Sequence, residues 1–202
     1  MGMKKNIFMV FSANMLSLIS GLVNGFVIPA VLTKGAYADV KTYTFYISYL
    51  GLLHLGFVDG MYIKYGGKEL EDIDKGELKA EHNTFLLMQL VVSGLFLVLS
   101  IVMKNMMLFL LSVTVIPVNT LQFYQLFYQA IGKFKDYSRN IYIYNGVMVI
   151  LNILLALGFR NKNYIFYCLA VLIYNIIACI LLEIIFFSDI KGIKSIYNKG
   201  IY

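Results

Sequence analysis

The sequence has few charged residues, no tryptophan and only two prolines. Charged residues make up 14% of the chain, whereas they make up about 25% of ordinary soluble domains. Apolar residues make up 60% of the chain, and its mean hydropathy is +0.76. A soluble domain of 202 residues cannot bury that much apolar surface, but a lipid bilayer leaves it in an apolar solvent. The composition therefore excludes a soluble fold and predicts an integral membrane protein.

Cysteines are few and the common catalytic motifs are absent. Cys168 and Cys179 lie in one apolar run, and on a single helix they would stand about 16 Å apart, beyond the reach of a disulfide. No Cys/His cluster has the spacing of metal ligands. No phosphate loop, zinc-protease motif or nucleophile elbow occurs either. The sequence thus predicts no metal, no cofactor and no enzymatic activity.

Six apolar runs predict six transmembrane helices within a single transmembrane domain that covers residues 1–202. Each is close to the length of about 20 residues that a bilayer requires, and backbone groups in lipid must be paired within the segment, as in a helix. The first run is longer than the 7–15-residue core of a signal peptide, so we expect it to be retained. The fold class is therefore an all-α, polytopic six-helix bundle. The runs cover residues 7–32, 42–63, 83–103, 106–131, 141–159 and 164–187.

The basic residues predict the orientation of the chain. Five of the 17 Lys and Arg residues lie on one side, namely Lys34, Lys41, Lys104, Arg160 and Lys162, and the other twelve lie at the termini and in the remaining connections. Since the richer side is cytoplasmic by the positive-inside rule, we expect both termini in the cytoplasm and the chain in the cytoplasmic membrane. Residues 190–202 form a predicted basic cytoplasmic tail. This distribution accounts for the net charge of +6 without a nucleic-acid partner.

Polar residues follow one face of the first predicted helix. Such residues are costly in lipid, so they face other helices or a water-filled cavity. The pattern indicates either close helix packing through a Gly-x-x-x-Gly pair or a cavity-lining helix that can bend at its glycines and proline. Five of these residues span an arc of about 100° and a proline lies near its edge: Asn14, Ser17, Gly21, Asn24, Gly25 and Pro29.

The fourth predicted helix carries four amides on one face. They span an arc of about 120°, and Pro117, one turn earlier, predicts a kink. Four amides are more than helix packing usually requires, and amides offer both donors and acceptors to sugar hydroxyls. Asn145 and Asn152 share a face of the fifth helix in the same way. We therefore expect a hydrated substrate pathway among these helices, with the fourth helix contributing Asn119, Gln122, Gln125 and Gln129.

Asp59 is the most unusual residue in the predicted second helix. A carboxylate at the bilayer centre costs about 2.5–3.5 kcal/mol on insertion scales. Asp59 lies near the cytoplasmic end of its helix, which leaves open either a structural role or an ion-coupling role. On a continuous helix His54 would lie about 140° away from Asp59, so we expect no contact between these two side chains.

Two segments resemble bacterial polysaccharide flippases. The segment Leu55-Gly56-Phe57-Val58-Asp59-Gly60-Met61-Tyr62-Ile63-Lys64-Tyr65-Gly66-Gly67-Lys68 resembles the end of their second helix, with its Asp-Gly step, aromatic residue, basic residue and Tyr-Gly-Gly. The segment Gln125–Asn140, with Gly132-Lys133-Phe134-Lys135, is similar to the exit of their fourth helix. The resemblance is to the multidrug/oligosaccharidyl-lipid/polysaccharide exporter superfamily. Its polysaccharide members move lipid-linked repeat units of O-antigen lipopolysaccharide or capsule across the cytoplasmic membrane.

The resemblance implies that this chain is one lobe of a larger exporter. Family members have twelve or more helices in two six-helix lobes, so the chain resembles the N-terminal half, either as an N-terminal lobe or as a truncated copy. The expected partners are the bilayer, a lipid-linked oligosaccharide, and a second lobe or polysaccharide-assembly proteins. One departure is that no Lys or Arg lies at the centre of a predicted helix, where a diphosphate would be bound. The alternatives are a multidrug or cation antiporter lobe and a non-transporting accessory or remnant membrane protein.

Overall fold

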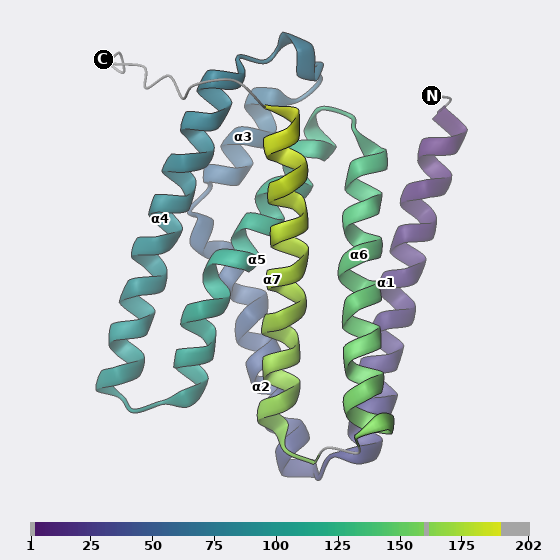
Figure 1. Cartoon of the computed structure of the whole chain (residues 1–202), viewed down its shortest axis with the longest axis vertical. Coiled ribbons are helices and arrows are strands. Elements are labelled where there is room, and N and C mark those ends of the chain that lie inside the picture. The colour runs from purple at the N-terminus through teal and green to yellow at the C-terminus, as the bar shows by residue number, and fades with distance from the viewer. Residues whose placement is uncertain (1–2, 160–161, 191–202) are drawn as a thin grey trace.

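Long helices make up most of the structure, a computed structural model that describes residues 3–159 and 162–190 (Figure 1). In chain order the elements are α1 (Met3–Val31), α2 (Lys34–Leu50), the 3-10 turn η1 (Gly51–His54), α3 (Phe57–Tyr65), the 3-10 turn η2 (Leu70–Asp72), α4 (Lys75–Val102), α5 (Met106–Ala130), α6 (Phe134–Ile153), the π-helical turn η3 (Leu154–Gly158) and α7 (Tyr164–Asp189). These described residues contain no β-strand. The predicted all-α fold is therefore confirmed.

Five of the described helices, α1, α4, α5, α6 and α7, are long and apolar enough to cross a membrane. Their burial differs widely. Within the most apolar stretch of each helix, 11% of residues are buried in α1 and 17% in α4, against 56% in α5. Apolar surface exposed on this scale suits lipid and not water. The chain is therefore a multi-pass helical membrane protein.

Helix α5 lies at the centre of the bundle and α1 lies at its edge. α5 packs against α2, α3, α4, α6 and α7, whereas α1 packs chiefly along α6, its neighbour in Figure 1. The buried side chains form two clusters around α5. One is aromatic and includes Phe85, Phe123 and Phe186, while the other includes Tyr43 and Tyr174.

The helix predicted at residues 42–63 is not continuous, which corrects the sequence-based assignment. α2 ends at Leu50, η1 follows, and Leu55 and Gly56 then adopt left-handed backbone angles with φ of 51° and 77°. Glycine tolerates this conformation because it has no Cβ, and it allows the chain to restart as α3. α2 also begins earlier than predicted, because the Thr33 side chain caps its N-terminus by accepting a hydrogen bond from the Ala36 amide at 3.3 Å.

Two other helices also begin earlier than predicted. α4 starts at Lys75 and not at residue 83, because the Asp74 carboxylate accepts hydrogen bonds from the Gly76 and Glu77 amides at 2.8 and 3.1 Å. α6 starts at Phe134 and not at residue 141. In both cases the first turns are polar, so the apolar pattern that marks a membrane span does not include them. The predicted basic tail beyond Ile190 lies outside the described residues.

One end of the bundle carries most of the described basic side chains. We call it the basic end, where α1 begins and α3, α5 and α7 end (Figure 1). Ion pairs tie the helices together there: Lys64 of α3 contacts Glu77 at 2.8 Å and also Glu81, both of α4. Lys133, which follows α5, lies 3.7 Å from Asp189 of α7. The basic residues at this end are Lys64, Lys68, Lys75, Lys79, Lys133, Lys135 and Arg139, while Lys34, Lys41, Lys104 and Lys162 lie toward the opposite end.

Candidate functional site

A polar pocket of about 460 Å³ opens at the surface of the bundle beside the end of α2. Its position is central, because Tyr144 and Asn175 in its wall lie near the midpoints of α6 and α7. None of its lining residues is charged. The lining residues are Ile47, Ser48 and Gly51 from α2 and η1, Val118, Leu121, Gln122, Gln125 and Leu126 from α5, Tyr144 from α6 and Asn175 from α7.

Several amide and hydroxyl groups of the polar pocket are held in place by their own helices or neighbours. The Asn175 amide nitrogen donates to the Val171 carbonyl at 2.7 Å, and Ser48 Oγ donates to the Phe45 carbonyl at 2.6 Å. The Tyr144 ring packs edge-on against Tyr174, with ring centroids 4.9 Å apart. The pocket is therefore lined by fixed neutral groups, and the donor and acceptor positions that these bonds leave open suit the hydroxyls of a sugar.

A network of side chains holds the break between α2 and α3. The buried His54 ring accepts a hydrogen bond at Nδ1 from the Gly56 amide at 3.1 Å. Because Nδ1 is an acceptor, the proton of the neutral ring is on Nε2, which faces the Gln122 side-chain amide at 3.2 Å. We infer that this amide turns its oxygen toward the ring, since amide orientation is assigned from its partners.

Two further amides complete this network. The Gln89 amide nitrogen of α4 donates to the Leu53 carbonyl at 3.3 Å, and the Asn119 amide nitrogen of α5 donates to Gln89 Oε1 at 2.6 Å. We call His54, Gln89, Asn119 and Gln122 the amide latch. It pairs backbone groups of the broken segment that have no intrahelical partner, which a membrane-embedded chain requires.

The break also brings together two groups that the sequence placed apart. His54 Nδ1 lies 3.9 Å from Asp59 Oδ2. The expectation of no contact was wrong, because it assumed one continuous helix, whereas the left-handed residues Leu55 and Gly56 turn the chain between the two side chains. The Asp59 side chain is 65% exposed, so it lies at the surface and not in the core.

Four of the predicted pathway residues join α1 to α6 instead of lining the polar pocket. The Asn152 amide nitrogen donates to Asn24 Oδ1 at 2.7 Å, and the Asn145 amide nitrogen donates to Ser17 Oγ at 2.9 Å. Asn24 and Asn152 also border a small cavity of about 40 Å³. These bonds form a polar ladder between the two helices, of the kind that associates helices in lipid.

The remaining predicted residues of the first helix range from exposed to half-buried. Asn14 is exposed on α1. An added Cβ at Gly21 or Gly25 would meet no atom within 4 Å, so neither glycine makes a close contact with another helix among the described residues. Pro29 is half-buried near the end of α1.

The amide face of α5 is divided among different partners. Gln122 and Gln125 line the polar pocket, whereas Asn119 is buried in the amide latch. Gln129 is half-buried in the last turn of α5 and is not among the residues that line the pocket. Pro117 is buried within α5 just before Val118 of the pocket wall.

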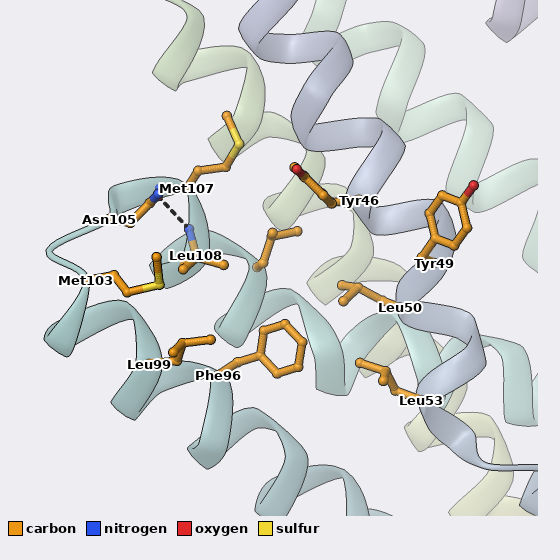
Figure 2. A pocket seen from close by; sticks show the side chains of 11 residues that line it. Tyr46, Tyr49, Leu50, Leu53, Phe96, Leu99, Met103, Asn105, Met107 and Leu108 are labelled. Carbon is orange, nitrogen blue, oxygen red and sulfur yellow. Dashed lines mark hydrogen bonds between the residues drawn. The ribbon is translucent and has the colours of Figure 1, made fainter.

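An apolar pocket of about 470 Å³ lies on another face of α2. Figure 2 shows side chains of α2 and η1, including Leu50 and Leu53, across from Phe96 and Leu99 of α4. Asn105 also lines it, but its side-chain oxygen accepts hydrogen bonds from the α5 N-terminus and caps that helix. A pocket with this lining suits a hydrocarbon chain.

Sequence reasoning missed some residues that shape the polar pocket and the break. Asn175 is a single amide in a long apolar run, so the cost of a polar group in lipid could have identified it. Tyr144 and His54 carried no such signal, because their roles come from helices that pack beside them. Comparison with protein-family models, with curated proteins and with solved structures finds no match for this chain. The two pockets and the broken helix are therefore the features that bear on its function.

Proposed function

We propose that this chain is a transport lobe that moves a lipid-linked oligosaccharide across the membrane, as a polysaccharide repeat-unit flippase does. One observation carries the proposal: an uncharged, amide-lined pocket lies at mid-depth beside a discontinuous helix. Discontinuous helices near the midplane are typical of substrate sites in transporters. Polar groups at that depth generally mark a pathway or a binding site, because lipid does not solvate them.

The two pockets match the two parts of such a substrate. Ser48 and Gly51 face the polar pocket, whereas Tyr49 and Leu50 face the apolar one. The end of α2 therefore contributes to a wall that is polar on one face and apolar on the other. A sugar headgroup fits the first pocket by its hydrogen bonds, and a polyprenyl chain fits the second or the bilayer beside it.

The proposal includes six membrane crossings, with both termini in the cytoplasm and the chain in the cytoplasmic membrane. The second crossing is the broken segment from α2 to α3, which runs from the opposite end of the bundle toward the basic end (Figure 1). The positive-inside rule makes the basic end cytoplasmic. This topology supports the likeness to one lobe of a two-lobed exporter.

The exposure of the polar pocket supports a partner for this lobe. Gln125 is only half-buried, and an amide left facing lipid costs free energy. A second six-helix lobe placed over the pocket would cover it and form a central cavity. Rocking of one lobe against the other then exposes that cavity to each side of the membrane in turn.

Deletion of the gene in its native cell tests the proposal with any partner still present. We expect lipid-linked repeat units to accumulate in the cytoplasmic leaflet, where periodate oxidises their sugars in inside-out vesicles. The full chain should restore export. Gln125→Met and Asn175→Leu should slow it about 2- to 10-fold, because each removes a hydrogen bond of about 0.5–1.5 kcal/mol. Asn83→Leu on α4, away from the pocket lining, is the matched control. An unchanged leaflet distribution in the deletion strain would refute the proposal.

A cation antiporter lobe is the second candidate, and the contact between His54 and Asp59 favours it. In that case Asp59→Asn abolishes ion-coupled efflux of a cationic dye from the cell. If the chain moves lipid-linked glycans without a cation, the same variant leaves export intact.

A further inference from the structure

A second ionisable site lies toward the basic end, among α4, α5 and α7. His82 of α4 is fully buried. Its Nε2 atom lies 2.8 Å from the Tyr124 hydroxyl of α5 and 3.4 Å from Glu183 Oε1 of α7. The rings of Phe123, Tyr124, Phe186 and Phe187 surround the imidazole, with centroids 4.8–5.9 Å away. This site is distinct from the polar pocket and the amide latch, with which it shares no side chain.

Two atoms of this site lack partners within the described part of the chain. His82 Nδ1 and Glu183 Oε2 are both buried and make no hydrogen bond there. His82 is also the only cationic group within ion-pair distance of Glu183 among the described side chains. The other titratable groups nearby are Tyr124 and Tyr128 from α5 and Cys179 from α7, with Lys79 one turn earlier on α4.

The charge of the site depends on one proton. With a neutral imidazole and an ionised carboxylate the site carries one net negative charge, which is unfavourable beside apolar rings; the Glu183 side chain is 24% exposed. One added proton makes the site neutral, either as an imidazolium–carboxylate pair or as an imidazole beside a carboxylic acid. We call these two the proton-loaded states of the site, and the net negative state the empty one.

We propose that His82 and Glu183, with Tyr124 as their hydrogen-bond partner, form a proton-binding site. The loaded site holds α4, α5 and α7 together through hydrogen bonds, whereas the empty site leaves a carboxylate that needs water or movement of α7. Proton uptake is thereby coupled to the spacing of three helices. The proton-binding site follows from the positions of these three side chains, and it does not depend on which substrate the protein transports.

Nuclear magnetic resonance of the full chain in lipid nanodiscs tests this site without any transport. The chain has two histidines, so ¹⁵N labelling of histidine gives two pairs of ring signals, one pair per imidazole, and His54→Asn assigns them. We expect the His82 ring signals, or a carboxylic-acid infrared band of Glu183, to change as the pH of the sample is varied. Glu183→Gln has the shape of the protonated acid and should remove that band. It should also move the His82 midpoint by at least about one pH unit, a tenfold change in proton affinity.

Two comparisons make the result decisive. Glu71→Gln, on the exposed turn η2, should leave both signals unchanged. Helical content measured by circular dichroism should be the same for Glu183→Gln and the unmodified chain. If the folded Glu183→Gln variant gives the same titration and the same infrared difference spectrum as the unmodified chain, the proton site does not exist.

Discussion

Replacement of His54 tests whether the amide latch holds the broken helix. The informative pair is His54→Asn and His54→Leu. The side-chain oxygen of Asn is the same number of bonds from Cβ as Nδ1 of histidine. In Asx turns this oxygen accepts a hydrogen bond from the backbone amide two residues later. Leu has nearly the same shape as Asn but offers no acceptor. The two variants therefore differ chiefly in whether the Gly56 amide keeps its partner.

The expected difference follows from the hydrogen bond that is lost. The Gly56 amide lies 3.1 Å from His54 Nδ1, and a donor left unpaired away from water costs about 1–3 kcal/mol. Both variants lose the ring contact with Gln122, so that loss cancels. The apolar side chain gains little in return, because helices that separate in a micelle remain in an apolar solvent. We therefore expect His54→Leu to be less stable than His54→Asn by about 1–3 kcal/mol.

Thermal unfolding of the purified variants in detergent measures this difference. For a chain of this size 1 kcal/mol corresponds to about 2–4 °C in Tm, so the two variants should differ by several degrees. Fluorescence of a thiol dye that reports exposure of the buried Cys168 gives the midpoint without relying on tryptophan. Equal midpoints, or a more stable leucine variant, would show that His54 does not hold the break.

The remaining predictions concern the pocket wall and the polar ladder. An added Cβ at Gly51 would lie 2.8 Å from the end of the Gln122 side-chain amide, so Gly51→Ala should lower stability by about 0.5–1.5 kcal/mol through loss of that amide's hydrogen bond. Gln122→Ala in the same chain should remove this penalty, and the control Gly94→Ala, which meets no atom within 4 Å, should be neutral or stabilising. Asn24→Ala and Asn152→Ala should show a coupling of about 0.6 kcal/mol in a double-mutant cycle, and strictly additive losses would contradict the ladder.

The sequence predicted the helical membrane fold where a single physical rule decides it. An apolar run as long as a bilayer is thick has to be a helix, and the bounds of α5 and α7 agree with prediction within two residues at each end. The break at Leu55 and Gly56 escaped prediction because the residues around it are apolar, as in an unbroken span. The bonds that hold it come from Gln89 and Asn119, which are distant in sequence. The hydropathy pattern of the segment itself gives no indication of partners that are distant in sequence.

The residues of the polar pocket were predicted only in part, again because their partners lie on other helices. The cost of amides in lipid identified Gln122 and Gln125, which line the polar pocket. The same rule also selected Asn24 and Asn152, which bond to each other between α1 and α6. A polar face shows that a helix needs a polar neighbour, but it does not say whether that neighbour is a cavity or another helix. His82 was missed for another reason, since it lies just before the predicted apolar run of residues 83–103 and therefore outside the predicted helix.

Helix α5 links the polar pocket to the proposed proton site. Gln125 faces the pocket, while Tyr124, the residue before it, contacts His82 at the other site. Pro117 lies within the same helix and removes one backbone hydrogen bond, which makes α5 easier to bend at that point. We expect a change at Tyr124 on loss of the proton to act on the backbone that also carries Gln125. The proposed proton site and the polar pocket share no side chain, but both include consecutive residues of α5, the most buried of the five long apolar helices that the structure describes.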